Sequence, residues 1–297
     1  MTESLGEVAA ITHRLAVLLA AGVAPVSAWS HVAVGATSAV PAAAAASGPA
    51  GIPGAIVAAA TGGDASARQA WRGLAAAWAV ATDAGAPLAP SLTSYASSLR
   101  ALADAQRDVR VALAGPKSTA RIVMVLPAIG VLFGLALGFN TLGVLVTTPP
   151  GWMCVAAGAA LMLLARYWTR RLLASAQPAD TTPGLDHDLA AIAVSGGGAL
   201  DRAVAAVHEA GATYGITVGD LDATLDLSRR AGVPAGDLLR GEAEERRRAA
   251  RADAQERAAA LSVRLMLPLG LCVLPAFMVL GVLPLLIAVV SSTVGTF

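Results

Sequence analysis

Three long runs of apolar residues interrupt the chain. The first, 122–146, has no charged residue; the second, 152–168, is shorter and charged only near its end; the third, 264–290, is uncharged after its first residue but contains three prolines. About 20 apolar residues let a helix cross the hydrocarbon core of a bilayer, and a membrane helix tolerates prolines where its neighbours satisfy the backbone. The pattern predicts three transmembrane helices, the first two forming a hairpin over 122–171 through the break TTPPG.

Positively charged residues flank one end of every predicted span. They are Lys117, Arg121, Arg166, Arg170, Arg171, Arg257 and Arg264. The opposite ends, at TTPPG and in the tail 291–297, carry no charge. Because short loops rich in Lys and Arg stay in the cytoplasm, the pattern predicts a multi-pass protein of the cell (inner) membrane. Its N-terminus would lie in the cytoplasm and its tail outside.

The amino-terminal segment resembles a secretory signal, since Arg14 precedes the apolar stretch LAVLLAAGVAPV. However, Glu3 and Glu7 come before it, and the apolar part reaches only about a dozen residues before Pro25, which is short for a membrane span. We interpret this segment as a cytoplasmic helix that ends at Gly22.

The polar residues gather in two regions, 1–121 and 172–263, and both have helical patterns. In the first, Leu102, Val109 and Leu113 fall on one side of a helix. In the second, each of three acids precedes an arginine by four residues, which is the favoured order for helical ion pairs. These pairs are Glu242 with Arg246, Glu244 with Arg248 and Asp253 with Arg257. The other face of this helix has small side chains, the alanines at 243, 250 and 254, which would let another helix approach closely.

A similar turn occurs in both polar regions, as AGAPLAPSL from Ala84 and AGVPAGDLL from Ala231. Glycine ends a helix in the left-handed conformation, and proline begins the next helix with its φ already set. The turn candidates are Gly85 with Pro87 and Gly232 with Pro234, while Gly22 with Pro25 and SGGGAL (195–200) are weaker versions. The expected fold is therefore an all-α membrane protein with two cytoplasmic helical-bundle domains, 1–121 and 172–263, and three transmembrane helices.

Two segments have the composition of connections. The stretch 41–63 is rich in Ala, Gly and Pro, and 177–183 is polar with two prolines. We expect a flexible connection at the first and a linker at the second.

Composition narrows the classes of function. Of 297 residues, 56% are hydrophobic and 14% charged, the net charge is +1 and aromatic residues make up 4%, so no basic or aromatic surface indicates nucleic-acid binding. Cys154 and Cys272 lie inside apolar runs without other metal ligands nearby. We expect no nucleic-acid partner, no metal and no cofactor.

The order of these motifs resembles the inner-membrane platform proteins of type II secretion systems and type IV pili, the type II secretion system F domain family. The residues that carry the resemblance are LLAAGVAPVSAW (18–29), WAVATDAGAPLAPSLTSYASSLR (78–100) with KSTARIVMVLP (117–127), and LSRRAGVPAGDLLR (227–240) with VRLMLPLGLCVLP (263–275). They are most similar to the tight-adherence (Tad) pilus proteins of actinobacteria. One departure is that the second polar region is shorter than the first, so one of the two domains is expected to be degenerate.

The resemblance implies a protein without enzymatic activity that transmits the motion of a cytoplasmic secretion ATPase to pilins in the membrane. The implied partners are that ATPase, a second platform protein or further copies of this chain, pilins and membrane lipid. The charged helix from Glu242 to Arg257 holds the candidates for partner contact, Glu242, Arg246, Arg247 and Arg248. A merely solvated helix explains the same pattern, and that alternative stays open.

Two other classes of function compete with a platform protein. An enzyme would need a catalytic motif, but His13, His31, His187 and His208 have no HExxH or nucleophile motif around them, and the triplet 196–198 lacks the order of a phosphate-binding loop. We expect His187, between Asp186 and Asp188, to lie at a solvated helix start. The alternative function is a subunit of an oligomeric transporter, although the spans carry no charge away from their ends.

Overall fold

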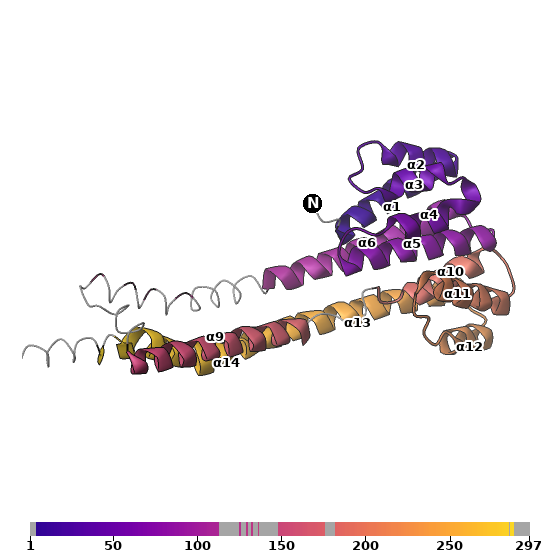
Figure 1. Cartoon of the computed structure of the whole chain (residues 1–297). Coiled ribbons are helices and arrows are strands. Elements are labelled where there is room, and N and C mark those ends of the chain that lie inside the picture. The colour runs from indigo at the N-terminus through magenta and orange to yellow at the C-terminus, as the bar shows by residue number, and fades with distance from the viewer. Residues whose placement is uncertain are drawn as a thin grey trace, which may run out of the picture. The chain divides into compact units, whose positions relative to one another are not determined.

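The computed structural model describes residues 4–112, 148–175 and 182–284, and the single positions 125, 129, 132, 136, 286 and 287 (Figure 1). All regular secondary structure in these ranges is helical, which confirms the all-α prediction for them. Apart from four positions, the first predicted span lies outside the described residues, as do most of the linker 177–183 and the tail 291–297.

The chain divides into two compact units. The first unit combines 1–106 with 178–252, and the second combines 107–177 with 253–297. The two polar regions therefore contribute to one unit, and the apolar stretches to the other. The division of the polar residues into separate domains, 1–121 and 172–263, stays a prediction.

The first half of the first unit has six α-helices and one 3₁₀ turn in the described residues. They are α1 (Leu5–Ala20), α2 (Pro25–Ala33), α3 (Val40–Ala46), η1 (Pro49–Gly51), α4 (Ile52–Ala59), α5 (Ala65–Asp83) and α6 (Leu88–Ala112). The prediction of a flexible connection over 41–63 is wrong, because α3, η1 and α4 occupy most of it. Alanine is the strongest helix former, and Pro41 and Pro53 stand in first turns, where a missing N–H costs little.

Helix α5 is the centre of the first unit. From Leu74 to Ala81 its residues are buried on almost every side, whereas Arg68 and Arg72 nearer its start are exposed, and it contacts α1, α4, α10 and α11. A stretch of helix that is apolar all round belongs in a core. Trp78 of α5 packs against Trp29 of α2 with ring centroids 5.8 Å apart, and Tyr95 of α6 donates a hydrogen bond to the Ala70 carbonyl. The first half of the chain is thereby packed around one helix.

The second half of this unit consists of α10 (Leu185–Ser195), α11 (Leu200–Tyr214), α12 (Asp222–Ala231) and the first part of α13 (Ala235–Arg264). Each end of helix α10 lies directly against the backbone of a neighbouring segment. A Cβ on Gly184 would lie 2.6 Å from the Ala243 carbonyl oxygen of α13, and a Cβ on Gly196 would lie 1.9 Å from the Ala84 carbonyl oxygen after α5. Only glycine permits these approaches.

The corner glycines have left-handed backbones. Gly22, Gly85 and Gly232 have φ values of +84°, +67° and +66°, and each follows the last residues of a helix. The N–H of Gly232 donates to the Ser228 carbonyl, which satisfies one of the free groups at the end of α12. Proline comes just before or at the start of the next helix: Pro25 begins α2, Pro87 precedes α6 and Pro234 precedes α13.

The described part of the second unit contains α9 (Pro149–Ser175) and the helical stretch that continues α13 through α14 (Met266–Pro268), η2 (Leu269–Val273), α15 (Leu274–Phe277) and η3 (Met278–Val282). Ala165 of α9 packs with Cys272 and Val273, and a Cβ on Gly158 would collide with the Leu280 side chain. Numbering rises on α9 as it falls on the partner, so the two helices are antiparallel. Helix α9 begins three residues before the predicted span 152–168 and extends seven beyond it.

The stretch after Arg264 contains two π-helical segments, η2 and η3. Each ends two residues before a proline of a repeated VLP sequence, Val273–Pro275 and Val282–Pro284. Proline has no N–H, so the α-helical bonds to the carbonyls of Leu271 and Leu280 cannot form. The wider i→i+5 turn is the local solution to this missing donor.

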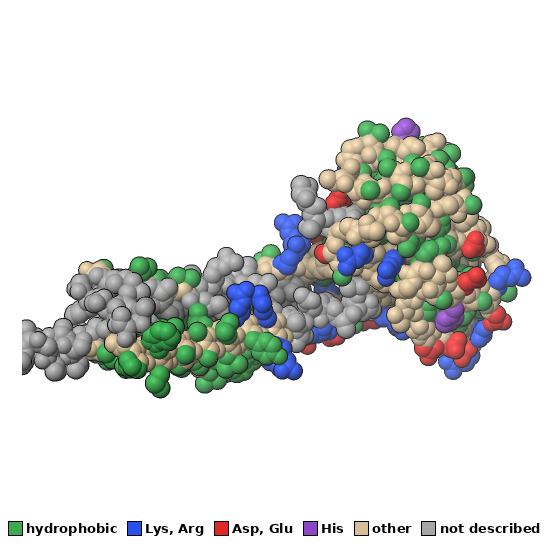
Figure 2. Space-filling model, in the orientation of Figure 1, with side chains coloured by type: hydrophobic (Ala, Val, Ile, Leu, Met, Phe, Trp, Pro, Cys, Tyr) green, Lys and Arg blue, Asp and Glu red, His purple; other side chains and the backbone are tan. Residues whose placement is uncertain are grey.

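Large apolar side chains are exposed along both helices of the second unit (Figure 2). They include Trp152, Met153, Leu163, Leu164, Tyr167, Met266, Leu267, Leu271, Leu274 and Met278. Among the described residues, Pro149–Leu172 and Ala235–Val282 are long and apolar enough to cross a membrane, judged by length and composition. Only 22% and 35% of their most apolar windows are buried, whereas a core helix of a soluble protein would be mostly buried.

We predict opposite effects of alanine at two glycines near the same corner. Neither Gly232 nor Gly241 has an atom within 4 Å of an added Cβ, but only Gly232 has a positive φ. Gly232→Ala should lower the free energy of unfolding by about 1 kcal/mol, because an L-residue is strained in the left-handed region. Gly241→Ala, inside α13, should raise it by up to about 1 kcal/mol. Thermal unfolding of both variants in a neutral detergent measures the difference; equal stabilities would contradict the corner geometry.

Candidate functional site: a buried charge network on helix α10

The first turn of α10 buries three titratable side chains in succession, Asp186, His187 and Asp188. Gly184 precedes them with φ +77° and lies against Ala243, so α13 covers this turn. The prediction that His187 lies at a solvated helix start is wrong: its exposed fraction is 0%. The cause is the close approach of α13.

Asp188 joins three helices. Its Oδ2 accepts a hydrogen bond of 2.7 Å from Nη1 of Arg247 on α13 and one of 3.0 Å from the Ser98 hydroxyl on α6. Asp188 is 4% exposed and the Arg247 side chain 15%. The pair is thus largely removed from water, where a charge-assisted bond is strong but loss of one partner is costly.

Asp186 accepts hydrogen bonds on both carboxylate oxygens. Oδ1 lies 2.9 Å from the backbone nitrogen of His187 and 2.9 Å from its ring Nδ1, and Oδ2 accepts a 3.0 Å bond from the Gly219 N–H. Arg246 Nη1 lies 3.6 Å from Oδ2. This carboxylate therefore fixes the loop before α12 as well as the imidazole.

The imidazole of His187 has only one polar partner in the described part of the chain. An ionised carboxylate only accepts hydrogen bonds, so Nδ1 carries the hydrogen that faces Asp186. Nε2 is buried without a hydrogen-bond partner. Because the ring has no contact with solvent, a substrate cannot reach it while α10 and α13 are packed, and the arrangement supports a structural rather than a catalytic role.

The two aspartates have opposite pKa shifts. Burial alone would raise the pKa of Asp186, but the hydrogen bonds and charge of His187 and the Gly219 N–H outweigh it and lower the pKa to about 2. At Asp188 burial dominates and raises the pKa, although Arg247 and Ser98 oppose the rise. Burial also raises the pKa of Tyr95, with the Asp188 charge adding to it.

A cavity of about 360 Å³ opens beside this network. Its walls include Pro87, Ser91 and Ser94 from the start of α6, Asp188 and Ile192 from α10, and Arg240 from α13. Ser91 already donates to the Pro87 carbonyl and Arg240 to Asp237. The cavity therefore combines a largely apolar wall with one edge of a buried carboxylate.

The partner-contact candidates have different environments. Glu242 and Arg246 pair with each other at 3.1 Å, and both are partly exposed. Arg247 points to Asp188, whereas Arg248 is 69% exposed and pairs with Glu244. Of the three adjacent arginines, Arg248 offers most of its side chain to a partner.

Sequence reasoning missed Asp186, Asp188 and Ser98 as a group. One signal was present: Arg246 and Arg248 each follow an acid by four residues, but the residue four before Arg247 is Ala243. Glu244, three residues before Arg247, pairs with Arg248 instead, so Arg247 needs another partner when its face of the helix is packed. The position of that partner, 59 residues earlier in the chain, is not contained in a helical pattern.

Comparisons with models of known protein families, with curated proteins and with solved structures return no match. Within the described residues, no group of three or more His, Cys, Asp or Glu is placed to hold a metal ion. Function is therefore inferred from the residues and geometry of this chain.

We predict a large difference between two neighbouring substitutions. Arg247→Ala should lower the free energy of unfolding by about 3 kcal/mol, because it leaves the carboxylate of Asp188 buried without its charged partner. Arg248→Ala, which removes an exposed pair with Glu244, should cost less than about 1 kcal/mol. Denaturant unfolding of the two variants measures the gap, and similar losses would mean that the buried pair contributes no more than a surface pair.

The lowered pKa of Asp186 predicts an acid-dependent loss of stability. Its folded pKa of about 2 lies below the ordinary value of 3.8, so the ionised carboxylate stabilises the fold above pH 4. That contribution, about 2 kcal/mol, disappears as the pH falls from 4 to 2. The stability gap between wild type and Asp186→Asn should therefore close over this range. Asp201→Asn, at an exposed carboxylate, is the control, and a gap that persists at pH 2 would refute the assignment.

Proposed function

We propose that this chain is an inner-membrane platform protein, of the kind that couples a cytoplasmic secretion ATPase to pilin assembly in Tad-like type IV pili or type II secretion. The observation that carries the proposal is the pairing of two apolar, outwardly exposed helices with a compact helical unit made from the polar regions. The choice of family rests on the order of the sequence motifs, which resembles that of the type II secretion system F domain family.

Membrane insertion accounts for the exposed surface of the second unit. Pro149–Leu172 has 24 residues, which corresponds to about 36 Å at 1.5 Å per residue and exceeds a hydrocarbon core of about 30 Å. Soluble monomers rarely expose continuous apolar surface on such a scale, because water would surround it at a high free-energy cost. In the proposed topology three helices span the membrane, the N-terminus is cytoplasmic and the C-terminus external, as the positions of the arginines favour.

A surface that receives mechanical force from an ATPase needs to be rigid. The first unit has this property, because its helices are held by glycine contacts at Gly184 and Gly196 and by the ion pair of Asp188 with Arg247. Helix α13 contributes residues to both units, and packed helices move as rigid elements. We therefore assign the exposed face of α13 that bears Glu244 and Arg248 to ATPase contact.

The platform acts without catalysing a reaction in this proposal. Its other partners are pilins in the membrane and a second platform protein or further copies of the chain. The buried network around Asp188 stiffens the unit that receives the force, and it does not touch the partner.

We predict that charge reversal at one exposed arginine weakens ATPase association. Arg248→Glu should reduce the amount of a genetically adjacent secretion ATPase that co-purifies with the full chain in mild detergent by about tenfold, which corresponds to one strong interfacial charge contact. Arg230→Glu, on exposed α12, is the control with the same charge change. Arg247 is left unchanged, because its reversal would disrupt the pair with Asp188.

Membrane extraction accompanies this experiment. The chain should resist alkaline carbonate and dissolve only in detergent. A wild-type chain that carbonate releases would overturn the membrane placement, and equal ATPase recovery with both variants would overturn the docking face.

A further inference from the structure

Four arginines beside the apolar helices of the second unit have no ion-pair partner among the described residues. They are Arg166, Arg170 and Arg171 of α9 and Arg264 at the end of α13, and all four are exposed. Earlier on α13 the situation differs: Arg240, Arg246, Arg247, Arg248 and Arg257 each lie within ion-pair distance of a carboxylate. On α13 the pairing of arginines with carboxylates therefore ends before Arg264.

The antiparallel packing brings Arg170, Arg171 and Arg264 to one level. Ala165 of α9 packs beside Cys272, so residues after Ala165 lie level with residues before Cys272. At 1.5 Å per residue, Arg171 is about 9 Å and Arg264 about 12 Å from that level, in the same direction. Arg170, Arg171 and Arg264 thus lie within one helical turn along the axis, and Arg166 lies about two turns from Arg264, nearer to Ala165. We call Arg166, Arg170, Arg171 and Arg264 the basic collar.

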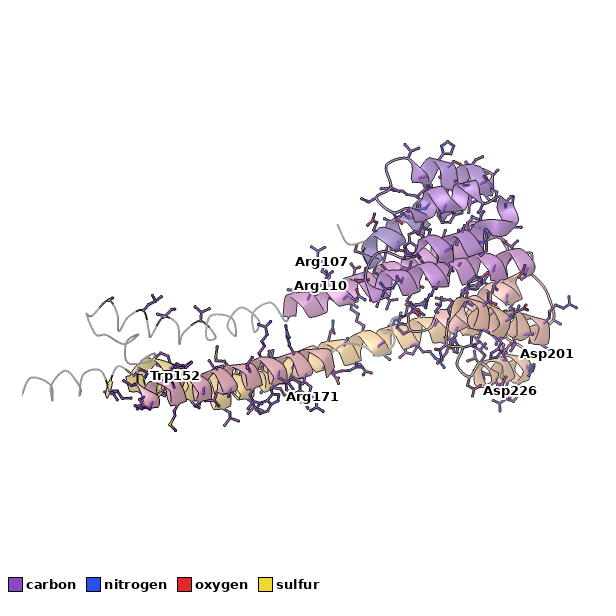
Figure 3. The ribbon with its side chains drawn as sticks, viewed as in Figure 1. Arg107, Arg110, Trp152, Arg171, Asp201 and Asp226 are labelled. Atoms are coloured by element: carbon purple, nitrogen blue, oxygen red, sulfur yellow. The ribbon has the colours of Figure 1, made fainter. Side chains whose placement is uncertain are left out.

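The surroundings of the collar specify its ligand. On one side begins the exposed apolar surface with Leu163, Leu164 and Tyr167, and Trp168 packs at the same level. Figure 3 shows Arg171 and Trp152 toward opposite ends of α9. No Asp or Glu occurs on α9, nor between Arg257 and the end of the described chain. A ligand here meets guanidinium groups and hydrocarbon surface together.

We propose that the basic collar is a binding site for anionic phospholipid. Guanidinium groups donate hydrogen bonds to the phosphodiester oxygens, while the acyl chains lie along Leu163, Leu164 and the apolar residues after Arg264. Arginines directly beside a membrane span attract anionic lipid, and Tyr and Trp favour the headgroup level. Free phosphate would use the charges but not the apolar surface, so the lipid is the source of the phosphate.

The inference rests on the membrane placement proposed above but not on the platform role. ATPase recovery can fail with Arg248→Glu while lipid binding stays intact, and the reverse holds as well. The two experiments therefore distinguish failure of the collar from failure of the platform proposal.

The test compares binding of fluorescent phosphatidylglycerol and of phosphatidylcholine with the same fluorophore to the full chain in neutral-detergent micelles. Wild type should prefer phosphatidylglycerol. The quadruple variant R166Q/R170Q/R171Q/R264Q should lose affinity for it by at least about tenfold, with little change for phosphatidylcholine. The matched control R14Q/R72Q/R100Q/R202Q removes the same number of exposed charges from the first unit and should keep the preference.

Three results would overturn the proposal. They are a wild-type chain without lipid preference, an equal loss in the control variant, and complete displacement of the lipid by an equal concentration of inorganic phosphate. Circular dichroism and gel filtration check that the variants are folded. If the quadruple variant aggregates, R170Q/R171Q replaces it, with an expected loss of about threefold, and an unchanged affinity in that variant is equally decisive against the collar.

Discussion

The close approach of α10 to its neighbours at Gly184 and Gly196 is the constraint on which the first unit depends. Any side chain at either position would occupy the space of a carbonyl oxygen, of Ala243 on one side and Ala84 on the other. The approach removes water from Asp186, His187 and Asp188, and desolvated charges require partners. Arg247, Ser98 and the Gly219 N–H supply them. A backbone contact thereby determines where the charges of α10 and α13 and the hydroxyl of Ser98 must lie.

The paired charges in turn specify how α13 meets α10. Burying two carboxylates and the guanidinium group of Arg247 brings little net stability, because the desolvation free energy offsets much of the attraction. Specificity is the larger effect: if α13 moved by one turn, Asp188 would lose Arg247 and Gly184 would no longer face Ala243. A receiving surface for mechanical force gains from such a single register. The platform proposal and the network are consistent for that reason.

Sequence patterns predicted those features that depend on nearby residues. The helical class, two of the apolar helices and the alanine seam at 243 and 254 follow from periodicity, and both alanines are buried. The segment 41–63 was misjudged because its Gly and Pro content outweighed its alanines, although all three of its prolines stand in first turns of helices. His187 was misjudged, and the partner of Arg247 was missed, for another reason: their environment comes from residues far away in the chain, which no local pattern records.

The two π-helical segments before Pro275 and Pro284 affect which changes in length the last helix can accept. Each segment holds one residue more than an α-helix of the same length, so the buried positions Ala276 and Gly281 are five apart rather than three or four. A chain that lost Pro275 or Pro284 would regain the missing donor and revert to an α-helix without rotating the residues beyond the deletion. The VLP repeat therefore makes this helix tolerant of single-residue deletions at two places, where an ordinary helix packed against α9 would lose its alignment.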